Sequence, residues 1–233
     1  MVVVAIQQPN YLPWLGYFRK IALADIFVFL DDVQYSKNSY TNRVQILADG
    51  APRWLTVPVG AHLGDPINRV RPARKDWPGA HLDTLRTRYH AAPAFRAVWP
   101  TVKEMFAGIP DADVATINQY LVLALVQHLG LSCRFLRASK IAPDRAGGDD
   151  GLVELVASVA PGACYLSGKG GAGYQDSEKF ERAGLGLRYV DFAHPRYDQG
   201  TAVFVPGLSV IDAAFRLGWA ETAALVTADC PVV

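Results

Sequence analysis

The chain has 233 residues, of which 51% are hydrophobic and 19% are charged, and its formal net charge is +1 at pH 7. This composition predicts a folded chain with a sizeable core and excludes a disordered one. The near-zero net charge argues against a nucleic-acid partner held by overall electrostatics, and none is expected.

The three cysteines are Cys133, Cys164 and Cys230, and no two of them form a C-x-x-C pair. Neither a disulfide framework nor a zinc site is therefore indicated. The first six residues lack the basic start and long apolar stretch of a signal peptide, and no apolar run approaches the length of a bilayer span. We expect a cytoplasmic protein without a membrane span.

The first part of the chain begins with alternating strand and helix signals. Strands are predicted at 2–6 and 26–30, separated by a loop at 7–13 and a helix at about 14–24 whose apolar residues share one face. Further strands at 43–47 and 53–59 flank Ala48-Asp49-Gly50. Asp-Gly is typical of a hairpin turn. Pro58 indicates that the second of these strands ends soon or lies at an edge.

Residues 60–78 are predicted to be irregular, with a short strand at 67–70. The elements expected after them are helices at about 78–91, 93–108 and 113–130, a strand at 133–138, a mobile loop at 143–150, a helix at 151–160, a strand at 163–167, a helix at 176–183, a strand at 187–192 and a final helix at 208–217.

The alternation of strands and helices at both ends predicts an α/β fold: a mostly parallel, Rossmann-like sheet with helices on both faces and a helix-rich middle segment. We expect a single α/β domain over residues 1–233. Residues 60–130 would then form either a helical subdomain or a cap over the site.

Polar and aromatic side chains are concentrated directly after the first predicted strand, where ligands bind in open α/β sheets. The candidate substrate-binding residues of this segment are Gln8, Asn10, Tyr11, Trp14 and Tyr17. The alternative is an aromatic cluster that only packs the first helix against the sheet.

Two carboxylates end the second predicted strand. Asp31 or Asp32 is a candidate catalytic residue that orients or deprotonates an acceptor. The alternative is that one caps a turn while the other pairs with Lys37 or Arg43. Lys37, Asn42 and Arg43 are candidate donors to a phosphate or carboxylate. No His or third carboxylate lies nearby in the sequence, so no metal site is expected.

A glycine-rich segment, Ser167-Gly168-Lys169-Gly170-Gly171-Ala172-Gly173-Tyr174, follows the strand at 163–167. It contains G-x-G-x-x-G, with Asp191 at about the spacing of a dinucleotide fold. Too little chain follows for the second half of such a domain, so a backbone nest that binds an anion is the better interpretation. Ser167, Gly168, Lys169, Gly170 and Gly171 are therefore candidate substrate-binding residues. The alternative is a flexible loop.

The last cluster is His194-Pro195-Arg196-Tyr197-Asp198-Gln199, after the strand at 187–192. His194 is a further candidate catalytic residue because imidazole exchanges a proton near neutral pH. Tyr197 and Gln199 are candidate substrate-binding residues. The alternative for His194 is a hydrogen-bonded structural role.

Together these segments resemble the WbqC-like family, over essentially the whole chain. The matching residues are Gln8-Pro9-x-Tyr11-x-Pro13-Trp14-x-Gly16-Tyr17-Phe18, Asp31-Asp32-Val33-Gln34-Tyr35-x-Lys37, Asn42-Arg43, Trp54-Leu55-Thr56-Val57-Pro58-Val59, Tyr165-Leu166-Ser167-Gly168-x-Gly170-Gly171, His194-Pro195-x-Tyr197-x-Gln199 and Phe204-Val205-Pro206-x-Leu208-Ser209-x-Ile211-Asp212. Gly207 and Arg216 depart from the family's pattern, in which Asn is expected.

The resemblance implies a group transferase that acts on an amino- or hydroxyl-bearing small molecule. The expected reaction is acyl or aminoacyl (glycyl-type) transfer to an amino sugar or similar amine in surface-polysaccharide or natural-product biosynthesis. Nucleotide-linked or phosphorylated compounds are among the expected substrates. The alternatives are a non-catalytic ligand-binding protein of such a pathway and an ATP-dependent nucleotidyltransferase or ligase-type enzyme. The cofactor and the oligomeric state stay open.

The opening segment also looks like the start of the HxGH nucleotidyltransferases. In that family two histidines stabilise the transferring phosphate, whereas Trp14 and Tyr17 occupy those places here. The fold is therefore compatible, but the same residues would not carry that chemistry.

Overall fold

The computed structural model describes residues 1–173 and 175–228; Tyr174 and Cys230, both named above, lie outside the described residues. A parallel sheet forms its centre, with the strand order β7-β2-β1-β8-β9. The strands are β1 (Val3–Gln7), β2 (Ile26–Phe29), β7 (Arg134–Arg137), β8 (Cys164–Gly168) and β9 (Gly186–Val190). This arrangement confirms the predicted α/β fold. The chain order reverses between β1 and β8, which makes that position the topological switch point.

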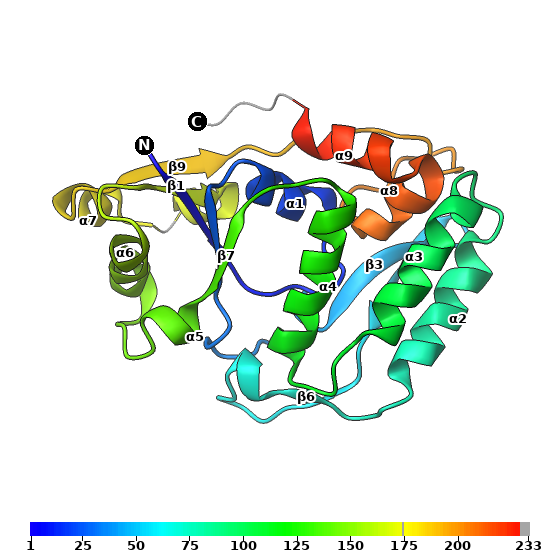
Figure 1. The fold of residues 1–233 in the computed structure, drawn as a ribbon, viewed down its shortest axis with the longest axis horizontal. Helices are drawn as coiled ribbons and strands as arrows, with labels where there is room; N and C mark the ends of the chain where they lie inside the picture. Colours follow the sequence, from blue (N-terminus) through cyan, green and yellow to red (C-terminus); the bar gives the residue numbers. More distant parts are fainter. Residues whose placement is uncertain (174, 229–233) are drawn as a thin grey trace.

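Successive side chains of the strands enter two hydrophobic clusters, one on each face of the sheet. Ala5 and Phe27 belong to the first cluster, and Val4 and Val28 belong to the second. The first face is covered by α1 (Leu15–Ala22), α4 (Val114–His128), α8 (Val210–Leu217) and α9 (Trp219–Thr227). The second face is covered by α5 (Ala138–Ile141), α6 (Gly148–Val159) and α7 (Ser177–Arg182). Figure 1 shows α6 and α7 on one side of the strands and α1 and α4 on the other.

The predicted hairpin is present as a separate antiparallel pair, β3 (Arg43–Ala48) and β4 (Ala51–Thr56). Asp49 and Gly50 connect the strands with φ values of 53° and 73°. Positive φ at both central residues is the geometry of a type I′ turn, which explains the Asp-Gly pair. β4 spans Ala51–Thr56, so it begins and ends earlier than the strand predicted at 53–59, and it ends before Pro58.

The predicted strand at 67–70 is wrong. Ile67–Arg69 form a 3-10 turn, η1, between the short paired strands β5 (Val59–Gly60) and β6 (Arg71–Pro72). The amides of Ile67 and Asn68 donate to the carbonyls of Val33 and Asp31 at 3.0 and 2.9 Å. Contacts with a distant part of the chain therefore set this backbone, and local β-propensity does not decide it.

The helices predicted in the middle segment are present, with α2 (Trp77–Tyr89) and α3 (Phe95–Ala107) preceding α4. They share the core of the first face with the C-terminal helices: Tyr89 packs on Phe215 at 5.0 Å between ring centroids, and the amide of Ala94 donates to the Phe215 carbonyl. In Figure 1, α2 and α3 lie beside β3, on the far side of the molecule from α6.

Two further differences from the sequence prediction concern α6 and the C-terminal helices. α6 begins at Gly148, inside the loop expected at 143–150. The C-terminal helix is followed by a second one, α9, because Gly218 adopts a φ of 90° and turns the chain between α8 and α9. Only glycine adopts this conformation without strain.

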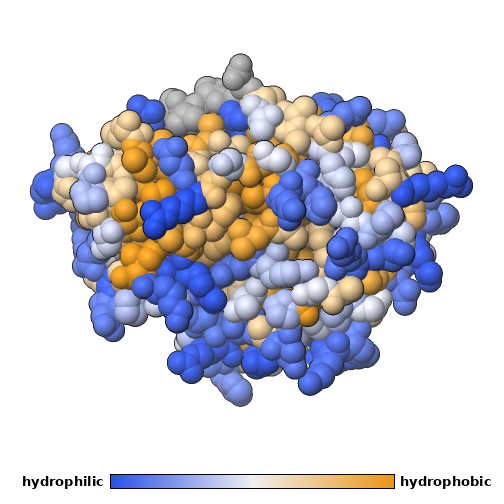
Figure 2. All heavy atoms as spheres, viewed as in Figure 1, coloured by the Kyte–Doolittle hydropathy of each residue, from blue (hydrophilic) through white to orange (hydrophobic). Residues whose placement is uncertain are grey.

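The surface view in Figure 2 shows hydrophilic side chains around the periphery and a more hydrophobic area across the middle, where Figure 1 has β7 and α4. Leu123 of α4 is one of the large apolar side chains that remain exposed. Within residues 1–173 and 175–228, no helix has the length and apolar character required to cross a bilayer.

Candidate functional site

A hollow of about 460 Å³ lies at the topological switch point, between the carboxyl ends of β1 and β8. Of the predicted site residues, Gln8, Trp14, Ser167, Gly168, Gly170 and Gly171 line it. Gln7, Lys20, Tyr165 and Gln175 contribute further polar groups to the lining. The structure thus brings the segment after β1 and the glycine-rich segment together, as the sequence predicts.

The glycine-rich segment continues from β8 into a 3-10 turn, η2 (Lys169–Gly173). At Gly171, an added Cβ atom would lie 2.6 Å from Ser167 Oγ and 2.5 Å from Gln175 Oε1. The absence of a side chain at this position therefore lets two polar groups approach the backbone closely. At Gly173 no atom of the described residues beyond its chain neighbours lies within 4 Å of an added Cβ, so the steric requirement is local to Gly171.

The predicted cation of this segment, Lys169, lies at the surface. Its Nζ is 2.9 and 3.0 Å from the two carboxylate oxygens of Asp191. The cation in the lining of the hollow is Lys20 of α1, which is only 5% exposed. Its Nζ donates to the Ile6 carbonyl at 2.7 Å and to Gln7 Oε1 at 3.1 Å.

Asp31 is fully buried, and its carboxylate joins three elements. Oδ2 accepts from Arg137 Nε at 2.9 Å and from the Ser139 hydroxyl at 2.8 Å, while Oδ1 accepts from the Ser139 amide. Both oxygens are therefore engaged by β7 and α5. This geometry favours a positioning role for Asp31.

Asp32 forms a two-pronged ion pair with Arg145, whose guanidinium nitrogens lie 2.7 and 2.5 Å from its two oxygens. The partners of Asp31 and Asp32 are thus Arg137 and Arg145, and not the predicted alternatives Lys37 and Arg43. Neither carboxylate lines the hollow at the switch point.

Three polar residues of the opening segment, Asn10, Tyr11 and Tyr17, are buried in the framework of the fold. The Tyr11 hydroxyl lies 2.7 Å from His81 Nδ1, and the Tyr17 hydroxyl donates to the Gln8 carbonyl at 3.0 Å. Burial raises the pKa of both tyrosines well above the usual value. Their contacts match the packing alternative, whereas Trp14 faces the hollow.

Lys37 and Asn42 line a second, larger hollow of about 690 Å³, between the segment at 34–42 and the chain after β4. Asn42 Nδ2 donates to the Val57 carbonyl, and its buried Oδ1 has no hydrogen-bond partner among the described residues. Arg43 lies with its guanidinium 4.0 Å from the Trp54 ring centroid, a cation–π contact. The predicted donors Lys37, Asn42 and Arg43 are therefore separate from the switch-point lining.

Tyr197 and Gln199 line a third, smaller hollow of about 330 Å³. The Tyr197 hydroxyl donates to Asp212 Oδ2 at 2.6 Å, and Tyr89 donates to Asp212 Oδ1 at 2.8 Å. Burial raises the pKa of the Asp212 carboxyl, which is fully enclosed in the helix α8 packing. Gln199 is held by the amide and carbonyl of Val205.

His194 is half-buried and packs edge-on against Phe192, with ring centroids 5.1 Å apart. Burial lowers the pKa of its imidazole, so the neutral form, which can accept a proton, is favoured at neutral pH. His194 does not line the switch-point hollow.

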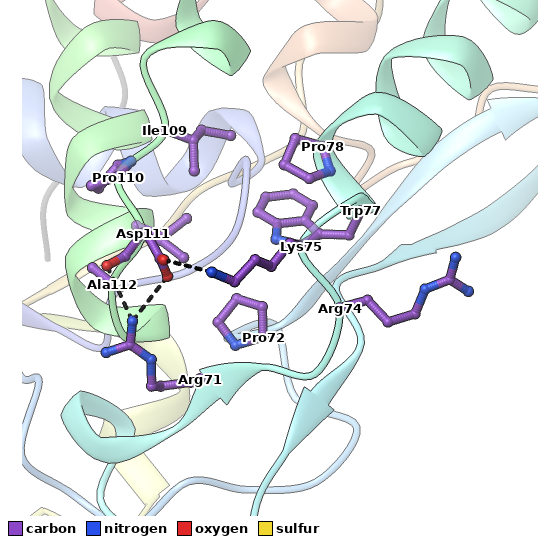
Figure 3. Close-up of a pocket in the computed structure, with 11 residues that line it drawn as sticks. Arg71, Pro72, Arg74, Lys75, Trp77, Pro78, Ile109, Pro110, Asp111 and Ala112 are labelled. Carbon is purple, nitrogen blue, oxygen red and sulfur yellow. Dashed lines mark hydrogen bonds and ion pairs between the residues drawn. The ribbon is translucent and has the colours of Figure 1, made fainter.

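A basic hollow of about 430 Å³ lies between β6 and the chain before α4, and Figure 3 shows its side chains. Arg71 and Lys75 both point to Asp111, at 3.0 and 3.2 Å, while Arg74 pairs with Asp76. These groups are exposed ion pairs. Two carboxylates, Asp76 and Asp111, therefore pair with three of the four positive charges of residues 69–75.

Comparison with known proteins gives two consistent matches. The model of the WbqC-like protein family matches residues 8–224. An uncharacterized protein of Mycobacterium tuberculosis, Rv1507c, is 31% identical over 224 residues, which cover 94% of this chain and 95% of that protein.

The chain belongs to the WbqC-like protein family. The match begins at Gln8, directly after β1, and ends in α9, so it includes the chain on both sides of the switch-point hollow.

Two positions depart from the pattern expected for a WbqC-like chain. Gly207 adopts a φ of 76° and lies next to the imidazole of His194. Arg216 reaches back to Gly200, where an added Cβ would lie 2.6 Å from Arg216 Nη1. Both residues therefore support the segment that carries His194, Tyr197 and Gln199.

The sequence motifs do not indicate Lys20, Arg137 or Arg145, which the structure places at the hollow or at the two carboxylates. The apolar residues of the first helix predict only one buried face, which does not include Arg19 or Lys20. α9 covers α1 on the Arg19 side, and the Arg19 guanidinium donates to the Val226 carbonyl. No signal in the local sequence indicates that second covering layer.

Within the described residues, no group of three or more His, Cys, Asp or Glu side chains is arranged to hold a metal ion. Cys133 and Cys164 are free thiols, half-buried and buried respectively. Burial raises the pKa of Cys133 to about 11, which disfavours its reactive thiolate form.

Proposed function

We propose that this WbqC-like chain is a group transferase for a small molecule that bears an amino or hydroxyl group. The reaction proposed is acyl or aminoacyl (glycyl-type) transfer to an amino sugar or a similar amine, in surface-polysaccharide or natural-product biosynthesis. The amine nitrogen would form a bond to the acyl carbon, the bond to the donor's leaving group would break, and the amine would lose a proton.

The observation that supports this proposal is the hollow at the switch point. Open α/β sheets bind their ligands at this place, outside the carboxyl ends of the strands. Its volume of about 460 Å³ suits a small molecule, and its lining combines flat apolar side chains with a few polar ones. Trp14, Gln8 and Ser167 of the family motifs all lie in this lining.

Within the proposal, Trp14 provides a stacking wall, and Gln8 and Ser167 hydrogen-bond the substrate. Asp31 holds the end of β2 through Arg137 and Ser139. Asp32 is held by Arg145 in the same region, and His194 lies outside the lining of the hollow, so neither side chain is assigned as the proton acceptor.

The test is to mix the protein with amino sugars and activated acyl or aminoacyl donors and to search for product by mass spectrometry. The variant Gly171→Ala should lower the rate by about 10- to 100-fold because its Cβ would displace Ser167 or Gln175 from the hollow. Gly173→Ala, in the same turn with open space around it, should keep the wild-type rate. Circular dichroism would verify that both variants fold.

Substrate binding without product, over a broad set of donors, would contradict the transferase proposal and indicate a ligand-binding protein of such a pathway. Magnesium-dependent consumption of ATP would instead indicate a nucleotidyltransferase or a ligase. Equal rates for the two glycine variants would remove the switch-point hollow from the reaction.

A further inference from the structure

Lys20 is a buried amine that lines the switch-point hollow. Its Nζ lies 2.7 Å from the Ile6 carbonyl oxygen and 3.1 Å from Gln7 Oε1, and both of these acceptors are uncharged. A protonated lysine has three N–H donors, so these two contacts leave one donor unused. The ring centroid of Tyr165, on the floor of the hollow, lies 6.0 Å from Nζ.

No carboxylate balances this amine within the described residues. The side chains that line the hollow include no Asp or Glu, and none of the ion pairs found in residues 1–173 and 175–228 involves Lys20. Burial lowers the pKa of Lys20 to about 7, with no contribution from a neighbouring charge. A buried cation without a counter-ion is costly, and a ligand can supply that counter-ion.

The charged groups on the surrounding elements are directed elsewhere. On α1, Arg19 donates to the Val226 carbonyl, and after β8, Lys169 pairs with Asp191. At the start of α6, Asp149 accepts from the Asp176 amide and Asp150 pairs with Lys179. Tyr165 is the other titratable side chain in the lining.

We propose that Lys20 is the anion-binding residue of the switch-point hollow, and that the hollow takes a small molecule carrying a carboxylate or phosphate group. The ligand anion accepts a hydrogen bond from the remaining N–H of Lys20. It lies against the backbone of Gly170 and Gly171, where uncharged hydrogen-bond donors add to the attraction of the ammonium charge. The assignment rests on the proposed function only in treating this ligand as a transferase substrate. The anion site itself can be tested without turnover.

Proton uptake follows from this arrangement. An anion beside Nζ favours the ammonium form, so Lys20 binds a proton together with the ligand when the pH is above the pKa of the free amine. For an anion whose own charge is constant, the affinity falls about tenfold for each pH unit above that pKa.

Inorganic sulfate and acetate are suitable probes, because both keep a constant charge between about pH 6 and pH 9 and represent a phosphate and a carboxylate respectively. The full chain, labelled with ¹³C-lysine, is titrated with pH by NMR at constant ionic strength, with and without each anion. The expected result is one lysine with a midpoint about three units below the ordinary value of about 10.4, which rises when the anion is added. If only one of the two anions raises the midpoint, that anion identifies whether the hollow binds a phosphate-like group or a carboxylate.

Lys20→Met should remove this resonance and lower the sulfate affinity at least about tenfold. Lys20→Arg should keep the affinity and lose its pH dependence, because guanidinium stays charged. Lys169→Met should leave the sulfate response unchanged. A midpoint that neither anion moves, or a response lost in Lys169→Met but kept in Lys20→Met, would overturn the proposal.

The wild-type titration keeps the test valid if Lys20→Met fails to fold. Its outcome is also independent of catalysis. A midpoint that depends on the anion, without any product, would contradict the transferase proposal and support the anion site. Product formation with an unchanged midpoint would support the transferase proposal and contradict the anion site.

Discussion

His81 is a buried imidazole that links the opening segment to the hairpin. Its Nδ1 accepts from the Tyr11 hydroxyl at 2.7 Å, which leaves Nε2 to donate to the Thr56 carbonyl at 3.1 Å. This pairing requires one neutral tautomer. Burial lowers the pKa of His81 to about 4, so the neutral form persists into the acidic range.

The pH dependence of stability should report this residue. In the unfolded chain His81 titrates near about 6.5, whereas in the folded protein it does so near 4, so the unfolded state binds more protons between these values. The free energy of unfolding should therefore fall as the pH drops from about 6.5 to 4, by up to about 3 kcal/mol from this residue. Urea unfolding at several pH values measures it.

His81→Gln is the matched variant, because glutamine offers one acceptor and two donors without titrating in this range. The wild type should lose more stability than this variant between the two pH values. Parallel curves for the two proteins would show that His81 does not carry the acid sensitivity.

At the scale of elements, Asp31 joins the end of β2 to β7 and α5. Its three hydrogen bonds reach Arg137 at the end of β7 and Ser139 in α5, more than 100 positions along the chain. A fully buried carboxylate in such a network contributes far more than an exposed pair, since its removal leaves its partners unsatisfied.

Asp31→Ala should lower the free energy of unfolding by about 2–4 kcal/mol, measured by urea denaturation. The matched control is Asp111→Ala, which removes an exposed carboxylate that also pairs with two cations, Arg71 and Lys75. That change should have little effect because water screens the pair. Similar losses for both variants would contradict the role assigned to Asp31.

At the scale of the whole molecule, one hydrophobic cluster runs from the sheet through α2, α3 and α4 to α8 and α9. Asn118 of α4 adds polar links, since its Nδ2 donates to the carbonyls of Pro9 and Thr41. The helices of the middle segment therefore share the core of the sheet, and a small separate cluster of Tyr35, Ile67, Val70, Val114 and Ala115 lies at its edge. This continuity favours the single domain expected from the sequence.

Thermal unfolding should accordingly proceed in one cooperative transition. The midpoints measured by far-ultraviolet circular dichroism, which reports the helices, and by near-ultraviolet circular dichroism, which reports aromatic packing, should coincide. An early helical transition that leaves aromatic packing intact would instead make 60–130 a separate unit.

The sequence by itself determined the elements whose signals are local. The Asp49-Gly50 turn, the strands of the sheet and the helices of the middle segment follow from residue type and spacing over a few positions, because turn geometry and amphipathic periodicity act over that range. It also located the segments after β1 and β8, since the carboxyl ends of parallel strands meet at one edge.

Only the tertiary structure decided which charged side chains are buried at the site and which partners they have. Lys20 is buried against the end of β1 and Tyr165 of β8, whereas the neighbouring Arg19 is covered by the chain near Val226. Arg137 and Arg145 reach Asp31 and Asp32 across more than 100 residues. The same packing directs Lys169 to Asp191 at the surface. Burial and ion pairing depend on which distant elements pack together, and local sequence patterns do not encode those contacts.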